Sequence, residues 1–144
     1  MNKVIITNVT DPVCPWCWGE EPFFRKLETH FPNLITWRNV MGGLVEDMNK
    51  NKPADMDAQS YYNKENKDFI AHCLETADKH HMPIKAEGFN LFSETENSSF
   101  PLCIAFKAAQ MADTEKADLF LYNLRAAVMA EARQAISETE LIAI

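Results

Sequence analysis

The sequence is poor in basic residues and lacks any long apolar run. Fourteen Lys and Arg stand against 21 Asp and Glu, which gives a net charge of −7. This sign opposes binding to the phosphates of nucleic acid or of an anionic membrane, so neither is expected as a partner. No stretch approaches the ~18 apolar residues that a membrane-spanning helix needs. The first apolar run, residues 4–6, is also too short for a signal peptide, so we expect a cytoplasmic protein.

Cysteine is also scarce. Four cysteines, at positions 14, 17, 73 and 103, are too few for a small domain held together by disulfides. One close pair and two single residues favour redox or metal chemistry instead. The length of 144 residues, with 47% hydrophobic and 24% charged residues, is typical of one globular domain.

The first third of the chain predicts a strand, a helix and a second strand. Residues 3–10 are rich in Val, Ile and Thr and stop at Asp11-Pro12, as expected for a short, mostly buried strand. Apolar residues at helical spacing predict a helix over residues 15–31, which Pro22 should kink. Residues 34–40 predict the second strand. This order is that of a parallel βαβ unit with a right-handed crossover.

The rest of the chain predicts helices. Apolar periodicity and capping residues favour helices over residues 57–81, from residue 98 or 99 to about 111, and over residues 114–133, with a loop at 84–97. A capping box that begins at Ser137 predicts one more helix. A parallel sheet of only two strands is not stable alone. We therefore expect the chain to be incomplete or to obtain strands from elsewhere; the alternative is a mostly helical domain with a vestigial hairpin.

Cys14 and Cys17 carry the clearest chemical signal. They lie one helical turn apart at the junction between strand and helix, where their sulfurs can form a disulfide. The helix N-terminus should stabilise a thiolate on Cys14, lower its pKa and make it the nucleophile. Cys17 can then resolve the mixed disulfide. Pro15 stiffens the loop and Trp16 adds apolar surface beside the sulfur, whereas a carboxylate of Asp11 close to Cys14 would oppose the thiolate.

A zinc site and a pair of unreactive buried thiols are the alternatives to redox chemistry at these cysteines. A zinc site would need two more ligands from Cys73, Cys103 or the four histidines, but the sequence has no second C-x-x-C and no H-x-x-x-H motif. Two unreactive buried cysteines would be better placed in the middle of an element. The position beside a βαβ unit favours redox chemistry, with no metal and no cofactor other than the cysteine pair.

Residues 11–22, Asp-Pro-Val-Cys-Pro-Trp-Cys-Trp-Gly-Glu-Glu-Pro, resemble the active-site segment of the DsbA-like thioredoxin-fold proteins. The similarity is to the predominantly cytosolic FrnE-type branch, which carries a CPWCW motif. Residues 98–109 similarly resemble the start of a helix in the inserted helical domain of that branch. The resemblance covers both ends of the chain.

This resemblance implies an α/β thioredoxin fold and thiol–disulfide oxidoreductase activity. Residues 1–48 would form the N-terminal βαβ half, and residues 49–144 a helical insertion domain that is truncated here. Such proteins return to the sheet with a cis-proline loop that faces the cysteines. None of the seven prolines is placed for that loop, so we expect the C-terminal ββα part to be missing.

Several residues are candidates for a substrate groove or for the core. Met41, Gly42 and Gly43 could line the groove, because glycine permits close backbone approach. Trp18 is a further groove candidate. Core positions explain Trp18 better, and the same holds for Phe23, Phe24 and Trp37. Cys73 and Cys103 are interpreted as buried single thiols.

The leading functional hypothesis is a dithiol–disulfide exchange enzyme with Cys14 as nucleophile and Cys17 as resolving thiol. It would act on protein or small-molecule disulfides. The alternatives are a redox-sensing adaptor that binds a protein partner, and a glutathione-dependent kappa-type isomerase or transferase. The kappa class generally lacks a cysteine at the position of Cys17, which counts against it. The substrate, the direction of electron flow and association into a homo-oligomer stay open.

Overall fold

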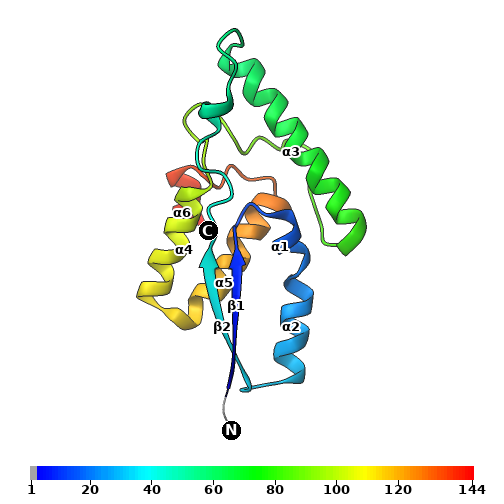
Figure 1. Ribbon diagram of the computed structural model, residues 1–144, viewed down its shortest axis with the longest axis vertical. Coiled ribbons are helices and arrows are strands. Elements are labelled where there is room, and N and C mark those ends of the chain that lie inside the picture. Colours follow the sequence, from blue (N-terminus) through cyan, green and yellow to red (C-terminus); the bar gives the residue numbers. More distant parts are fainter. Residues whose placement is uncertain (1–2) are drawn as a thin grey trace.

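The computed structural model describes residues 3–144, in which helices pack against two strands (Figure 1). The elements follow one another as β1 (Val4–Thr10), α1 (Pro15–Gly19), α2 (Glu21–His30), β2 (Ile35–Met41), the short 3-10 helix η1 (Met48–Asn51), α3 (Ala58–His80), α4 (Phe100–Ala112), α5 (Thr114–Met129) and α6 (Glu138–Ala143).

The two strands pair in parallel, which confirms the predicted βαβ unit. Their register runs from Val4 opposite Ile35 to Thr10 opposite Met41. Both cysteines of the pair follow directly after the C-terminal end of β1. The carboxyl edge of this sheet therefore presents the candidate site.

The prediction that the first strand is mostly buried is wrong. Val4, Ile5 and Val9 are 60%, 67% and 69% exposed, whereas Thr10 is only 3% exposed. Exposed and covered residues alternate along much of both strands, as the pleat of a strand requires. In the described part of the chain, helices therefore cover one face of the sheet and leave the other in solvent.

Two helices replace the single kinked helix that the sequence predicts. α1 ends at Gly19 and α2 begins at Glu21, with Glu20 as the cap of both. Pro22 lies in the first turn of α2, where its missing N–H costs no hydrogen bond. Within a continuous helix this proline would leave the carbonyl of Trp18 without its partner, so the break at Glu20 has a simple cause.

The other helices begin and end at residues suited to those positions. Asp57 caps α3 by accepting a hydrogen bond of 2.9 Å from the backbone N–H of Ser60, and His81 ends it with φ of 60°. Ser137 caps α6 by accepting from the N–H of Glu140, as the capping box predicts. The segment predicted as a loop, residues 84–97, contains no helix. No helix within residues 3–144 is long and apolar enough to cross a membrane.

The core is built around α5, which contributes Leu121, Leu124 and Val128, all no more than 2% exposed. Val13 and Trp18, which lie before position 48, pack into this core with the residues of α5, which lie after it. The division into parts 1–48 and 49–144 stays a prediction.

Three aromatic side chains predicted for the core differ in their burial. Phe23 is 63% exposed on the outer side of α2, so its prediction is wrong. Phe24 and Trp37 are half-buried and pack against each other with ring centroids 4.9 Å apart. Their contact covers part of the inner face of the sheet.

Candidate active site

The cysteine pair lies at the start of α1. Cys14 is the N-cap residue, and its Sγ accepts a hydrogen bond of 3.3 Å from the backbone N–H of Cys17. Pro15 occupies the first helical position. Both cysteines are free and half-buried, and the indole of Trp16 beside them is 49% exposed. Two thiols of this spacing and partial exposure can exchange with an external disulfide.

A hydrogen bond between the side chains of Cys14 and Cys17 is the main cause of the shifts in their pKa values. The bond from the Cys14 thiol lowers the pKa of Cys17 to about 6, against the opposing effect of burial. The Thr10 hydroxyl, the Asp11 backbone and the charge of Arg125 lower this pKa further. The same bond and burial raise the pKa of Cys14.

The expectation that the pKa of Cys14 is the lowered one stays a prediction, and the backbone N–H of Cys17 that donates to the Cys14 sulfur is the contact that favours a thiolate there. The two thiols titrate as a coupled pair: the first proton leaves easily and the second is retained between the sulfurs. The pair as a whole therefore keeps one thiolate near neutral pH.

A cavity of about 190 Å³ opens beside the two sulfurs. Gly42 reaches it from the end of β2, where its backbone N–H donates to the Thr10 carbonyl over 2.7 Å. The walls of the cavity are Val9, Thr10, Asp11, Cys14, Cys17, Gly42 and Leu44. The structure therefore brings Gly42, one of the groove candidates, to the cysteine pair.

Met41 and Gly43 line a neighbouring cavity of about 430 Å³, which Gly42 also borders. Gly43 has φ of 65°, and a Cβ atom there would lie 2.7 Å from the Phe100 ring. The position thus requires glycine for both its conformation and its contact with α4.

Trp18 does not face this groove. Its side chain is 1% exposed, its Nε1 donates to the Pro83 carbonyl over 3.0 Å, and its ring packs on Tyr122. The core interpretation of Trp18 is confirmed, and its candidacy as a groove residue is wrong, because a buried indole offers no surface to a substrate.

Asp11 has a role that sequence reasoning missed. Its carboxylate is 3% exposed and accepts hydrogen bonds from the N–H of Val13, the N–H of Leu44, the hydroxyl of Ser99 and the thiol of Cys103. These bonds tie the loop that carries Cys14 to the segment after β2 and to the start of α4. The Asp-Pro dipeptide, typical of an Asx turn, is the sequence signal that could have indicated it.

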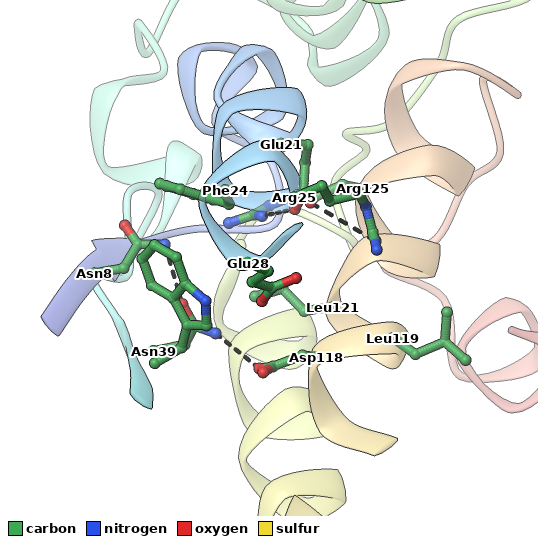
Figure 2. Close-up of a pocket in the computed structure, with 11 residues that line it drawn as sticks. Asn8, Glu21, Phe24, Arg25, Glu28, Asn39, Asp118, Leu119, Leu121 and Arg125 are labelled. Atoms are coloured by element: carbon green, nitrogen blue, oxygen red, sulfur yellow. Dashed lines mark hydrogen bonds and ion pairs between the residues drawn. The ribbon is translucent and has the colours of Figure 1, made fainter. Parts of the chain in front are cut away.

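A buried cluster of Thr10, Glu21 and Arg125, of which Thr10 lines the same cavity as the two cysteines, was likewise not predicted from the sequence. Arg125 is 1% exposed; its Nη1 donates to Glu21 Oε1 and its Nη2 to Thr10 Oγ1. Figure 2 shows Arg125 reaching from α5 toward Glu21 on α2. Because Leu121, Arg125 and Val128 recur at helical spacing, the arginine could have been placed on the buried face of its helix.

The two single cysteines are buried, as predicted. Cys73 lies 4.0 Å from the sulfur of Met129, and Cys103 lies 3.4 Å from Asp11 Oδ2. Burial raises the pKa of each to about 12. Within residues 3–144, no three His, Cys, Asp or Glu side chains come close enough to hold a metal ion.

Comparison with known proteins relates this chain to a group that includes the ClpXP adapter protein SpxH of Bacillus subtilis (strain 168). The chain is 22% identical to SpxH over 134 residues, covering 93% of this chain and 41% of that protein. It thus spans less than half the length of this relative.

Two solved structures of the cytosolic disulfide reductase DsbM from Pseudomonas aeruginosa are similar to this chain. The first superposes with a TM-score of 0.69 at 20% identity, and the second, of the same protein with GSH, with a TM-score of 0.68 at 21% identity. Each match covers 97% of this chain and 62% of the other. At this identity the likeness establishes the fold.

The family model described as Thioredoxin matches residues 8–144, which include β2, all the helices and both cysteines of the pair. Together with the DsbM structures, this match confirms the predicted DsbA-like α/β fold with its helical content. The chain therefore belongs to the thioredoxin family.

Proposed function

We propose that this chain is a thiol–disulfide oxidoreductase that works through Cys14 and Cys17. The observation that carries the proposal is the hydrogen-bonded sulfur pair at the N-terminus of α1, with a pKa of about 6 for Cys17, beside an open cavity. A sulfur pair that keeps one thiolate near neutral pH is what disulfide exchange requires. The similarity to the disulfide reductase DsbM supports the same function, and the cytosolic location of DsbM supports a cytoplasmic location here.

Exchange begins at Cys14. Its Sγ attacks one sulfur of a substrate disulfide and passes its proton to the Cys17 thiolate along the shared hydrogen bond. A mixed disulfide between Cys14 and the substrate forms, and the other half of the substrate leaves as a thiolate. The backbone N–H of Cys17, 3.3 Å from the Cys14 sulfur, stabilises negative charge on that sulfur as it attacks.

The second step belongs to Cys17. Its thiol loses the proton again, and the thiolate attacks Cys14 Sγ, so that the second half of the substrate leaves as a thiolate and a Cys14–Cys17 disulfide remains. Two electrons pass from the cysteine pair to the substrate. A dithiol, or two molecules of a small thiol such as glutathione, must return them; the DsbM structure with GSH supports this class of reductant.

The cavity beside the sulfurs suits an extended disulfide-bearing segment or a small disulfide. Gly42 and Leu44 from one side and Val9 from the other give it mostly apolar walls. Trp16, which lies between the two cysteines in the chain, has a half-exposed indole that offers further apolar contact surface. These features favour substrates that present uncharged groups around the disulfide.

The test is to trap the intermediate. Cys17→Ser should accumulate mixed disulfides through Cys14, whereas Cys14→Ser should accumulate few, as seen on non-reducing gels with a disulfide-bonded protein substrate. Cys73→Ala, which removes a buried thiol away from the site, serves as the control and should behave as wild type. Equal trapping by both pair variants would show that the two sulfurs do not have the stated roles.

The SpxH relative favours a second candidate, an adaptor that binds a protein partner. The two functions differ in their need for the sulfurs. A Cys14→Ser/Cys17→Ser double variant should lose all exchange activity if the chain is an oxidoreductase, whereas an adaptor would keep its affinity for the partner. The kappa-type alternative gains no support, because Cys17 is present and hydrogen-bonded to Cys14.

A further inference from the structure

We propose that His80 is a positioning residue for Trp16: in its uncharged form the imidazole fixes the orientation of the indole, and protonation of the imidazole releases it. Trp16 is the aromatic residue between the two cysteines of the pair, so the inference deepens the proposed function. It rests on that function for its meaning in catalysis, whereas the contact between the two rings can be tested without a substrate.

His80 lies in the last turn of α3, which packs against α1 (Figure 1). The ring centroids of His80 and Trp16 are 6.4 Å apart and their planes meet at 73°, an edge-to-face arrangement. The imidazole also lies against the backbone of α1, because a Cβ atom at Gly19 would overlap it. Two residues of α1, one helical turn apart, therefore contact the same ring.

The two ring nitrogens of His80 have different roles. His81 ends α3 with φ of 60°, and the chain then turns so that the backbone N–H of Met82 donates to Nδ1 of His80 over 3.0 Å. Nδ1 is therefore the unprotonated nitrogen of the neutral ring, and Nε2 carries the hydrogen. Nε2 is buried and has no hydrogen-bond partner among the described residues. The backbone thus selects one tautomer of an uncharged imidazole.

A second proton has no favourable place on this ring. It would bind to Nδ1, where it would face the N–H of Met82, and two donors cannot form a hydrogen bond with each other. The charged ring would also keep Nε2 buried without a partner. Rotation of the ring relieves both costs but breaks its packing on Trp16 and Gly19. Protonation of His80 and the contact with the indole therefore oppose each other.

The charges near the contact favour the neutral ring. Burial lowers the pKa of His80, and the positive charge of His81 lowers it further. The other titratable residues close to the contact in the chain are Cys17 and Glu20 on α1 and Asp78 and Lys79 on α3. Within the described residues, no carboxylate is among the groups that shift the pKa of His80. The ring is therefore neutral at pH 7 and becomes charged only on acidification.

The orientation of Trp16 bears on substrate binding because its indole is 49% exposed. An exposed side chain that is already fixed loses less conformational entropy when a ligand packs on it. Neutral His80 therefore favours binding of a substrate against the indole. Acidification weakens this binding through His80, separately from any change in the ionisation of the sulfurs.

The first experiment follows both rings by NMR of the reduced protein between about pH 5 and pH 8. The indole N–H signal of Trp16, assigned with Trp16→Phe, should move with the same midpoint as the ring protons of His80. Nδ1 of the neutral ring should show the chemical shift of an unprotonated nitrogen. His80→Phe keeps an aromatic ring but cannot titrate, so it should abolish the movement. His72→Phe, at an exposed position of the same helix, is the matched control and should leave it unchanged.

A kinetic experiment tests the link to the substrate. His80→Asn keeps an acceptor for the N–H of Met82 but has no ring. It should raise KM for a disulfide substrate about fivefold at neutral pH, the equilibrium weight of one aromatic pair, and leave kcat nearly unchanged. His80→Phe should keep the KM of the wild type at neutral pH and lose its rise in acid.

Three results would overturn the proposal: a Trp16 signal that still titrates in His80→Phe, a proton on Nδ1 of His80 at neutral pH, or an unchanged KM in folded His80→Asn. The NMR experiment uses no disulfide, so its outcome is independent of the trapping experiment that tests the proposed function. If the expected NMR result is found in a chain without exchange activity, the proposed function fails and the contact stands.

Discussion

The carboxylate of Asp11 and the hydroxyl of Ser99 are 88 residues apart in the chain and form a buried hydrogen bond of 2.9 Å. Ser99 also accepts from the N–H of Val45. The bond therefore links the loop in front of the cysteine pair to the start of α4 and to the segment after β2. The position of the pair depends on contacts made by the second half of the chain.

Asp11→Asn should destabilise the protein by about 1–3 kcal/mol. All four groups that face the carboxylate are donors, so an amide nitrogen in place of one oxygen leaves at least one buried donor without an acceptor. Urea unfolding measures the loss. Asp55→Asn, at an exposed position in a loop, is the control; equal losses in both would contradict this role of Asp11.

Cys14→Ser should raise the pKa of Cys17. The hydrogen bond from the Cys14 thiol is the largest of the effects that lower this pKa to about 6, and a serine hydroxyl is a different donor at a different distance. Thiolate absorbance in a pH titration would report the change. A titration curve that stays near pH 6 in the variant would mean that Thr10 and Arg125 suffice without Cys14.

The reduced protein should gain stability as the pH rises from about 6 toward 9. The pKa of Cys17 is lowered from 9.0 to about 6, so the folded protein loses this proton before the unfolded chain does. The stabilisation is complete above the pKa of Cys17 in the unfolded chain, and it is lost as the pH falls through the pKa of Cys17 in the folded protein. Urea unfolding at several pH values, compared with Cys17→Ser, would isolate the effect, because the variant lacks the titrating sulfur.

Gly19→Ala should destabilise the contact between α1 and α3 by about 1–3 kcal/mol. A Cβ atom at this position would overlap the His80 ring. Adding His80→Ala should recover much of the loss, because it removes the atoms that clash; a double-mutant cycle in thermal unfolding measures the coupling. Losses that simply add would show that the two residues are not in contact.

Local features of the site were predictable from the sequence. The strand ending before Asp11-Pro12, the proline after Cys14 and the spacing of the two cysteines all act within one or two helical turns. The cap at Ser137 is similarly local, and the structure shows it. Signals of this range depend on backbone conformation and hydrogen bonding between near neighbours.

The features that could not be predicted depend on contacts between distant parts of the chain. The apolar residues of β1 do not alternate strictly, because Val4, Ile5 and Val9 fall on both faces, so the burial of the strand depends on which helices pack against it. The pKa of Cys17 depends in part on Arg125, which the sequence shows only as one of several charged residues in the segment 114–129. Trp18 lies one residue after Cys17, but its burial is decided by contacts with Pro83 and Tyr122.

The bond between Thr10 and Arg125 spans 115 residues, and this separation has a consequence for synthesis of the protein. A ribosome releases the cysteine pair early and Arg125 late. Until α5 docks, Cys17 lacks the charge of Arg125, which is one of the groups that lower its pKa. The low pKa of Cys17 therefore develops in full only once a helix that is made much later has folded.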